Sequence, residues 1–427
     1  MSTYITLIND VCRLLQRAKY CRILYADQSK WEIPVVETFL TDFSRLNSVP
    51  TETASFEELC ESGALFRYSG DPQKSRVTRL EQEFARYVGM KYALGVNSCS
   101  SAILLALKLC GVKTGTRVLV PAFTFTAVPS AIVHAGAEPI LVETEEDFCM
   151  DVDDFRRKAS QAKVLLLSHM RGYVSDLDDI TKICDEHSIV MIEDAAHALG
   201  CTWQGKPVGS FGKIGCYSFQ SNKIINTGEG GMLTTDDEEL FAKAVILSGA
   251  YENLYRFHGI DSKLFDKNKK LLPLFNMRYT EIQAAMALPQ LKSLDERAAA
   301  YRDLHGRLLQ KIRKASNLVV FPDEDGREVR VPDSLQFRIP SFSAQQMKRF
   351  VTEVQAKGLP LFGLGIDKDN ARAFWNWEYL GKTSNLEATR YILATTCDMR
   401  LPISLTDEHL DYAANAIGAA ARTAETA

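Results

Sequence analysis

The stretch "SIVMIEDAAHALG", residues 188–200, decides the fold class. Its apolar run has no polar alternation and ends in two acids, Glu193 and Asp194. A strand that is buried on both faces has this appearance, because both faces contact apolar neighbours. Four more runs of this kind precede it, and helix-like segments separate them: "KYALGVNS" (91–98), "TRVLVPAFTFTA" (116–127), "AEPILVET" (137–144) and "KVLLLSHM" (163–170).

Strands that alternate with helices predict a doubly wound α/β fold with a mostly parallel sheet. A long helical pattern over 281–315, interrupted by Pro289, leads to a smaller α+β unit. We therefore expect three parts. These are an N-terminal helical extension over 1–75, a large α/β domain over 76–300 and a small C-terminal α+β domain over 301–427.

The bulk composition excludes several classes of protein. The chain has 427 residues, 46% of them hydrophobic and 24% charged, with a net charge of −4. This charge predicts neither a nucleic-acid nor a membrane partner. The ten cysteines include no CxxC pair and no zinc-like spacing, so we expect reduced thiols and no metal. Without a signal-peptide pattern or a long apolar run, the chain is expected to be cytoplasmic.

Ligands of such sheets bind beyond the carboxyl ends of the strands, where Asp194 stands. Lys223 follows within "CYSFQSNKIINTGEGGM" (216–232), in a glycine-rich run without helical period. A protonated pyridine nitrogen is a suitable partner for a buried carboxylate, and a lysine amine can form a Schiff base with an aldehyde. The two residues are the minimal equipment for pyridoxal phosphate (PLP) chemistry. Taken singly, Asp194 is more often a cap and Lys223 more often a solvated side chain.

Two further features fit such a cofactor. "NSCSSAILLALKL" (97–109) places small polar residues at a helix N-terminus, which is a ready anion site or, in the plainer interpretation, an ordinary N-cap. Phe125 or Phe123 follows a strand and would provide an aromatic platform for a flat ring, unless both are core residues.

Three motifs carry a resemblance to a known family. "EDAAHALG" (193–200), "CYSFQSNKIINTGEGGM" (216–232) and "FNMRYTEIQAAMAL" (275–288) closely resemble the DegT/StrS-type sugar aminotransferases, a branch of the fold-type I PLP enzymes. The resemblance runs from about Val77 to Leu288 and continues faintly beyond. It implies a fold-type I PLP-transferase architecture.

The resemblance also implies roles for single residues. Lys223 matches the lysine that binds the cofactor covalently, and Asp194 the partner of the pyridine nitrogen. The other matches concern the cofactor's periphery: His197 beside its O3′, Ser218, Cys99 and Ser100 at its phosphate, Phe125 over its ring, and Asn276 at the phosphate of the other subunit. The last match implies a homodimer with shared sites.

Arg171, in "HMRGYVSDLDD" (169–179), departs from the family pattern, which reads His-Leu-Tyr-Gly here. One hypothesis is that Arg171 binds an anionic group of a substrate. The alternative is that it pairs with Asp176 or Asp178. Cys99 in place of a glycine is a second departure.

The predicted function is PLP-dependent transfer of an amino group from glutamate or glutamine to a keto sugar, nucleotide keto-sugar or keto-cyclitol. One alternative is an aminotransferase for a non-sugar keto compound with an anionic group. Another is a PLP-binding regulatory protein without turnover, although binding alone does not require Lys223, Asp194 and His197 together.

Overall fold

The computed structural model describes residues 42–323, 325–381 and 385–426. Residues from Asp42 onward belong to one compact unit. Most of the expected N-terminal extension, residues 1–41, lies outside the described residues. Its described part contains α3 (Thr53–Ser62) and a 3₁₀ turn, η1 (Pro72–Lys74).

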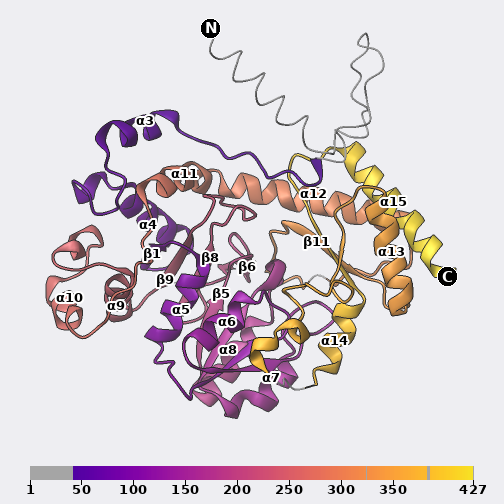
Figure 1. Ribbon diagram of the computed structural model, residues 1–427, viewed down its shortest axis with the longest axis horizontal. Coiled ribbons are helices and arrows are strands. Elements are labelled where there is room, and N and C mark those ends of the chain that lie inside the picture. The colour runs from indigo at the N-terminus through magenta and orange to yellow at the C-terminus, as the bar shows by residue number, and fades with distance from the viewer. Residues whose placement is uncertain (1–41, 324, 382–384, 427) are drawn as a thin grey trace, which may run out of the picture. The chain divides into compact units, whose positions relative to one another are not determined.

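A seven-stranded sheet organises the larger part of the chain (Figure 1). Strands β3, β2, β4, β5 and β8 run parallel to one another, whereas β9 is antiparallel to both β8 and β1. The predicted α/β fold with a mostly parallel sheet is therefore confirmed. In spatial order the strands are β1 (Tyr92–Val96), β9 (Gly231–Thr235), β8 (Ile214–Ser218), β5 (Val190–Asp194), β4 (Val164–Ser168), β2 (Arg117–Pro121) and β3 (Glu138–Val142).

Helices cover both faces of this sheet, which explains why the strands lack polar alternation. Along β4, Leu165 and Leu167 enter one apolar core and Leu166 enters the other. The first core is completed by α4 (Arg76–Tyr87), α7 (Val152–Lys158), α8 (Leu177–His187) and α11 (Glu281–Lys292). The second is completed by α5 (Cys99–Leu109), α6 (Ala127–His134), α9 (Glu238–Ser248) and α10 (Ser262–Lys269).

The C-terminal part is built on a three-stranded sheet, in the order β11 (Ser334–Arg338), β13 (Thr396–Arg400) and β12 (Phe362–Gly363). It also contains α13 (Ala344–Ala356), α14 (Glu387–Ala394) and α15 (Asp407–Glu425), and Figure 1 shows α12 (Leu294–Ala315) running towards α15 and α13. A small sheet of β10 (Glu328–Val329), β6 (Thr202–Trp203) and β7 (Lys206–Pro207) connects this part with the first. The domain boundary expected at 300/301 falls inside α12.

The helical pattern over 281–315 is interrupted, but the predicted position was wrong. Pro289 lies inside α11, and the break comes at Ser293, between α11 and α12. A proline removes one backbone donor from a helix, and α11 continues in spite of that loss. Over the described ranges, we find no helix with the length and hydropathy needed to span a bilayer.

Candidate active site

A cavity of about 420 Å³ lies beyond the carboxyl ends of the parallel strands. Its position follows the rule for open α/β sheets. Seven of the eight residues predicted to hold a cofactor line it together: Cys99, Ser100, Phe125, Asp194, His197, Ser218 and Lys223. Side chains that are far apart in the sequence thus share one site, because the strands that carry or precede them end at the same edge of the sheet.

Asp194 is the last residue of β5, and its buried carboxylate is held from several sides. Thr124 Oγ1 donates to Ser168 Oγ at 2.8 Å, and Ser168 Oγ donates to Asp194 Oδ2 at 2.7 Å. The backbone N–H of Ala196 donates to Oδ1 at 3.1 Å. These contacts fix the orientation of the carboxylate. Its oxygens can still accept another hydrogen bond from a donor in the cavity.

Lys223 lies in the loop between β8 and β9. The loop is closed by backbone hydrogen bonds, among them Ser221 N–H to the Gly228 carbonyl at 3.0 Å and Lys223 N–H to the Gln220 carbonyl at 2.8 Å. Gly231 lets β9 pass close to the start of α5, where a side chain at 231 would approach the Cys99 nitrogen to 2.6 Å. Gly231 is therefore needed for the close packing of β9 against the start of α5, and Lys223, in the loop before β9, lines the cavity.

The amine of Lys223 lies 2.8 Å from His197 Nε2. Burial, and next the charge of Arg400, lower the pKa of Lys223 to about 7, well below the ~10.4 of a free lysine. Burial and the charge of Lys223 hold the pKa of His197 well below its usual range, so the imidazole is neutral. Its Nδ1 faces Asp333 at 3.8 Å, which favours the proton on Nδ1 and leaves Nε2 as an acceptor for Lys223.

The start of α5 forms another wall of the cavity. Ser98 is the N-cap, and its side chain accepts a hydrogen bond from the Ser101 N–H at 3.1 Å. The first N–H groups of a helix have no partner within the helix and attract anions. Burial, with Asp194 next to it, raises the pKa of the Cys99 thiol well above its usual range, so Cys99 stays protonated. The cysteine that replaces a glycine here is therefore a neutral donor towards Asp194.

The structure distinguishes the two candidate aromatic platforms. Phe125 lines the cavity and is 45% exposed. Phe123 is 2% exposed and packs against Phe148, with ring centroids 5.9 Å apart. Only Phe125 is therefore available to a ligand in the cavity, and Phe123 belongs to the core.

Two predicted residues do not line this cavity. Asn276 is exposed, and its backbone carbonyl accepts from Asn97 Nδ2 at 3.5 Å. Arg171 is 2% exposed and contacts the carboxylate of Asp398, which is neither of the two acids named in the alternative. A contact of Arg171 with a substrate stays a prediction that no contact in the structure supports.

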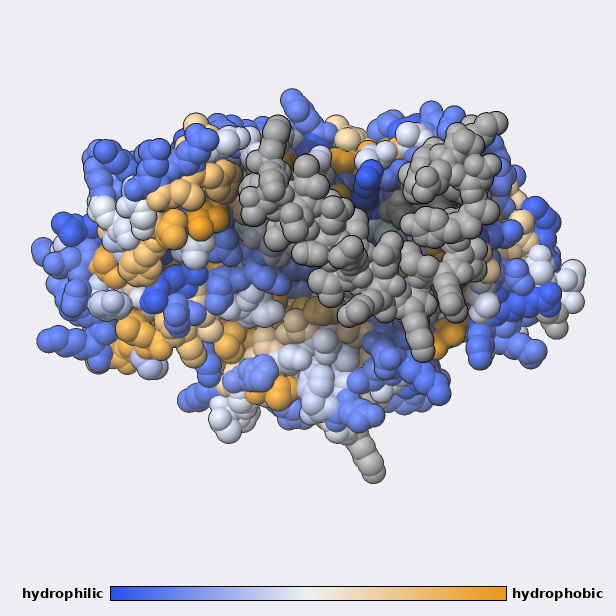
Figure 2. All heavy atoms as spheres, turned by 45° about the horizontal axis from the view of Figure 1, so that its top comes forward, coloured by the Kyte–Doolittle hydropathy of each residue, from blue (hydrophilic) through white to orange (hydrophobic). Residues whose placement is uncertain are grey.

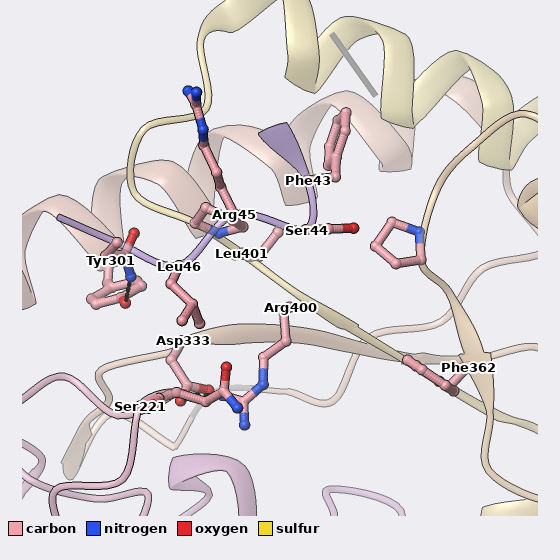
Figure 3. A pocket seen from close by; sticks show the side chains of 14 residues that line it. Phe43, Ser44, Arg45, Leu46, Ser221, Tyr301, Asp333, Phe362, Arg400 and Leu401 are labelled. Atoms are coloured by element: carbon pink, nitrogen blue, oxygen red, sulfur yellow. Dashed lines mark hydrogen bonds and ion pairs between the residues drawn. The ribbon is translucent and has the colours of Figure 1, made fainter. Parts of the chain in front are cut away.

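Two arginines from the C-terminal part also line the cavity, although neither was predicted as a site residue: Arg372 and Arg400. A second pocket of about 130 Å³ adjoins the first and shares Asn222 and Arg400 with it (Figure 3). Residues 43–47 form one side of this second pocket. Within the described part of the chain, no group of three or more His, Cys, Asp or Glu side chains is placed to hold a metal ion.

Comparison with known proteins identifies a family and relatives that match much of the described unit. A family model described as "DegT/DnrJ/EryC1/StrS aminotransferase family" matches residues 50–418. The GDP-perosamine synthase of Caulobacter vibrioides is 36% identical over 250 residues, 58% of this chain and 64% of that protein. The match thus spans somewhat less than two thirds of that relative. The 3-amino-5-hydroxybenzoate synthase of Amycolatopsis mediterranei is 32% identical over 323 residues, 74% of this chain and 79% of that protein.

Solved structures resemble the chain over more of its length. The crystal structure of a 3-amino-5-hydroxybenzoic acid synthase superimposes with a TM-score of 0.75 and 26% identity. It covers 89% of this chain and 99% of that one. An aminotransferase from Psychrobacter cryohalolentis has a TM-score of 0.77 at 23% identity, over 89% of this chain and 100% of its own, which supports the fold.

Proposed function

Because the chain belongs to the DegT/DnrJ/EryC1/StrS aminotransferase family, we propose that it is a PLP-dependent aminotransferase. It takes an amino group from glutamate or glutamine and delivers it to a keto sugar, nucleotide keto-sugar or keto-cyclitol. The observation that carries this proposal is the pairing of a lysine amine of lowered pKa with a neutral histidine, in the cavity that Asp194 also lines.

The residues of the cavity suit PLP. Asp194 offers a buried carboxylate with Ser168 behind it, as a protonated ring nitrogen requires. Lys223 offers an amine whose pKa is lowered to about 7 by burial, which favours the unprotonated form that attack on an aldehyde requires. The start of α5, with Ser100 and the nearby Ser218, offers N–H and hydroxyl donors to a phosphate. Phe125 offers an aromatic face to the ring.

When bound, PLP supplies an aldehyde that captures the amino donor and a ring that withdraws electrons from the reacting carbon. Residues of the chain orient the reacting groups and move the proton. The Asp194 carboxylate would accept a hydrogen bond from the ring N–H and so favour the protonated nitrogen. His197 Nε2 accepts a hydrogen bond from Lys223 and orients its amine. The Lys223 amine would act as the general base that removes the proton from the donor's α-carbon.

We also propose a homodimer in which Asn276 reaches the site of the partner subunit. Asn276 is exposed and lies outside its own cavity. Hydrophobic side chains are grouped on the left of the face in Figure 2, the side on which α3, α10 and α11 lie in Figure 1. The exposed apolar residues near Asn276 include Leu65, Phe66, Leu271, Leu274, Phe275 and Ile282. Exposed apolar groups of this kind mark interaction surfaces.

Sedimentation equilibrium checks the dimer. We expect a particle of twice 47.7 kDa at micromolar concentration, and a particle of 47.7 kDa would contradict the proposal.

For the location of the protein we propose the cytoplasm, since the eight cysteines within the described residues are free thiols. Cell fractionation checks this assignment.

A half-reaction tests the activity itself. The PLP-loaded protein is expected to lose its yellow colour when glutamate or glutamine is added, and to regain it when a keto sugar or keto-cyclitol follows. Return of the colour only with non-sugar keto acids would favour the alternative acceptor class. A protein that stays yellow with every amine donor is a binding protein without turnover, and the proposed activity would be wrong.

A further inference from the structure

Asp333 brings a carboxylate from the C-terminal part of the chain to the side chain of His197. It directly precedes β11 and belongs to none of the three motifs that carry the family resemblance. The side chains of Asp333 and His197 are each 10% exposed, and Asp333 Oδ2 lies 3.8 Å from His197 Nδ1. The other ring nitrogen, Nε2, contacts the amine of Lys223 at 2.8 Å. The imidazole therefore lies between the amine and a carboxylate.

Backbone contacts hold Asp333 at this position. Its neighbour Val331 donates its N–H to Cys201 Sγ at 3.3 Å, in the segment that follows β5. A side chain at Gly200 would approach Val331 Cγ2 to 3.3 Å, so the two segments pack closely. The Leu401 N–H donates to the Asp333 carbonyl at 3.0 Å and attaches Asp333 to the end of β13. The carboxylate is thus fixed next to the turn after β5 by the main chain.

The Asp333 carboxylate is also oriented by its own hydrogen bonds. Ser334 Oγ donates to Oδ1 at 2.8 Å, and Arg400 Nη1 donates to Oδ2 at 2.6 Å. Figure 3 shows the Arg400 guanidinium beside Asp333. Burial alone would raise the pKa of Asp333, but the charge of Arg400 holds it well below its usual range, so the carboxylate is charged. A charged carboxylate oxygen accepts more than one hydrogen bond, so Oδ2 can serve His197 as well as Arg400.

His197 Nδ1 has no other acceptor near it. This nitrogen is buried and makes no hydrogen bond within the described part of the chain. A neutral imidazole donates from one nitrogen and accepts with the other, so the choice of tautomer decides what Lys223 meets. At 3.8 Å the attraction between Nδ1–H and the Asp333 carboxylate is electrostatic. An approach of about 0.8 Å would give a hydrogen bond of ordinary length.

We propose that Asp333 is a positioning residue for amino transfer, which acts through His197 on the amine of Lys223. Its carboxylate keeps the His197 proton on Nδ1, so that Nε2 accepts an N–H of Lys223 and the lone pair of the amine stays available in the cavity. In the opposite tautomer, Nε2–H would donate to that lone pair and block the group that takes up the proton. The inference rests on the proposed function, because Lys223 is the general base of that reaction.

Nitrogen NMR of the full-length protein, labelled with nitrogen-15 histidine, tests the tautomer directly. The signals of His197 are those that disappear in His197→Gln. In the unmodified protein we expect a protonated Nδ1 and an unprotonated Nε2. Asp333→Asn removes the charge that favours Nδ1–H, so a signal of protonated Nε2 should appear. A His197 ring that carries its proton on Nε2 in the unmodified protein would overturn the proposal, and this result does not depend on the folding of any Asp333 variant.

The rate of the half-reaction with saturating glutamate or glutamine tests whether the effect reaches Lys223. We expect Asp333→Asn to lower this rate roughly 10–100-fold, as the loss of a carboxylate behind a functional histidine does. Asp333→Glu, which keeps the charge, should retain more of the rate than Asp333→Asn. In a His197→Gln background, Asp333→Asn should add little, because the residue through which it acts is gone. Losses that multiply in the double variant, or an unchanged rate of Asp333→Asn, would contradict the proposal.

Asp303→Asn is the matched control. Asp303 lies on the surface of α12, where its carboxylate pairs with Arg307 Nε at 2.9 Å. Its replacement should change neither the tautomer of His197 nor the rate of the half-reaction. If the unmodified protein shows no half-reaction with any donor, the proposed function fails, whereas the NMR measurement still decides whether Asp333 sets the tautomer of His197.

Discussion

Replacement of Lys223 by alanine removes the covalent attachment of PLP and lowers amino transfer by a factor on the order of 10⁴ or more. The loss combines the missing attachment with the missing general base, which alone contributes roughly 10²–10⁴-fold. PLP can still bind through Asp194 and the start of α5, so the expected product is a protein that holds the cofactor reversibly. Dialysis followed by absorbance measurement distinguishes reversible from covalent binding, and the half-reaction gives the rate.

Lys213→Ala is the matched control for this variant. Lys213 is close in sequence, lies outside the cavity and pairs with Asp237 at 2.8 Å. It should keep the attachment and the rate of the unmodified protein. A Lys223→Ala protein that transfers amino groups at nearly the original rate would show that another residue is the base.

Asp194→Asn is expected to lower kcat by roughly 10²–10³-fold, the usual effect of removing one preorganised electrostatic partner. Asparagine keeps the size of the side chain but has no charge to hold a proton on the ring nitrogen. The bound ring should then titrate at lower pH than in the unmodified protein, which absorbance at a series of pH values measures.

Ser168→Ala provides a graded comparison for Asp194. It removes one hydrogen bond of 2.7 Å to the carboxylate and leaves the charge in place. We expect a much smaller loss of kcat than with Asp194→Asn. Equal kcat values for Asp194→Asn and the unmodified protein would contradict the role of Asp194.

The fold could be predicted because its signal is local. Each apolar run, such as 163–168, reports burial on both faces, and the runs alternate with helical segments along the chain. This local signal does not distinguish the surroundings of the adjacent acids Glu193 and Asp194. Glu193 is fully buried and accepts from the backbone of Gly209 and Gly212, at 2.8 and 2.6 Å, on the side away from the cavity. Strand alternation, rather than residue type, gives the two acids different surroundings.

The site could be predicted only where its residues follow parallel strands. Asp194 and Phe125 stand at strand ends, and Lys223 stands in a loop with a distinctive glycine run. Arg372 and Arg400 reach the cavity through tertiary packing of the C-terminal part, and no local pattern marks them. For Arg171 the composition of its own segment pointed to Asp176 and Asp178, whereas its partner, Asp398, lies 227 positions away in sequence.

Reductive trapping tests the central claim most directly. The PLP-loaded protein is treated with borohydride, digested and mapped by mass spectrometry. The account predicts one modified peptide, with the cofactor on the side chain at position 223. A cofactor trapped on another lysine, or no modified peptide at all, would contradict it.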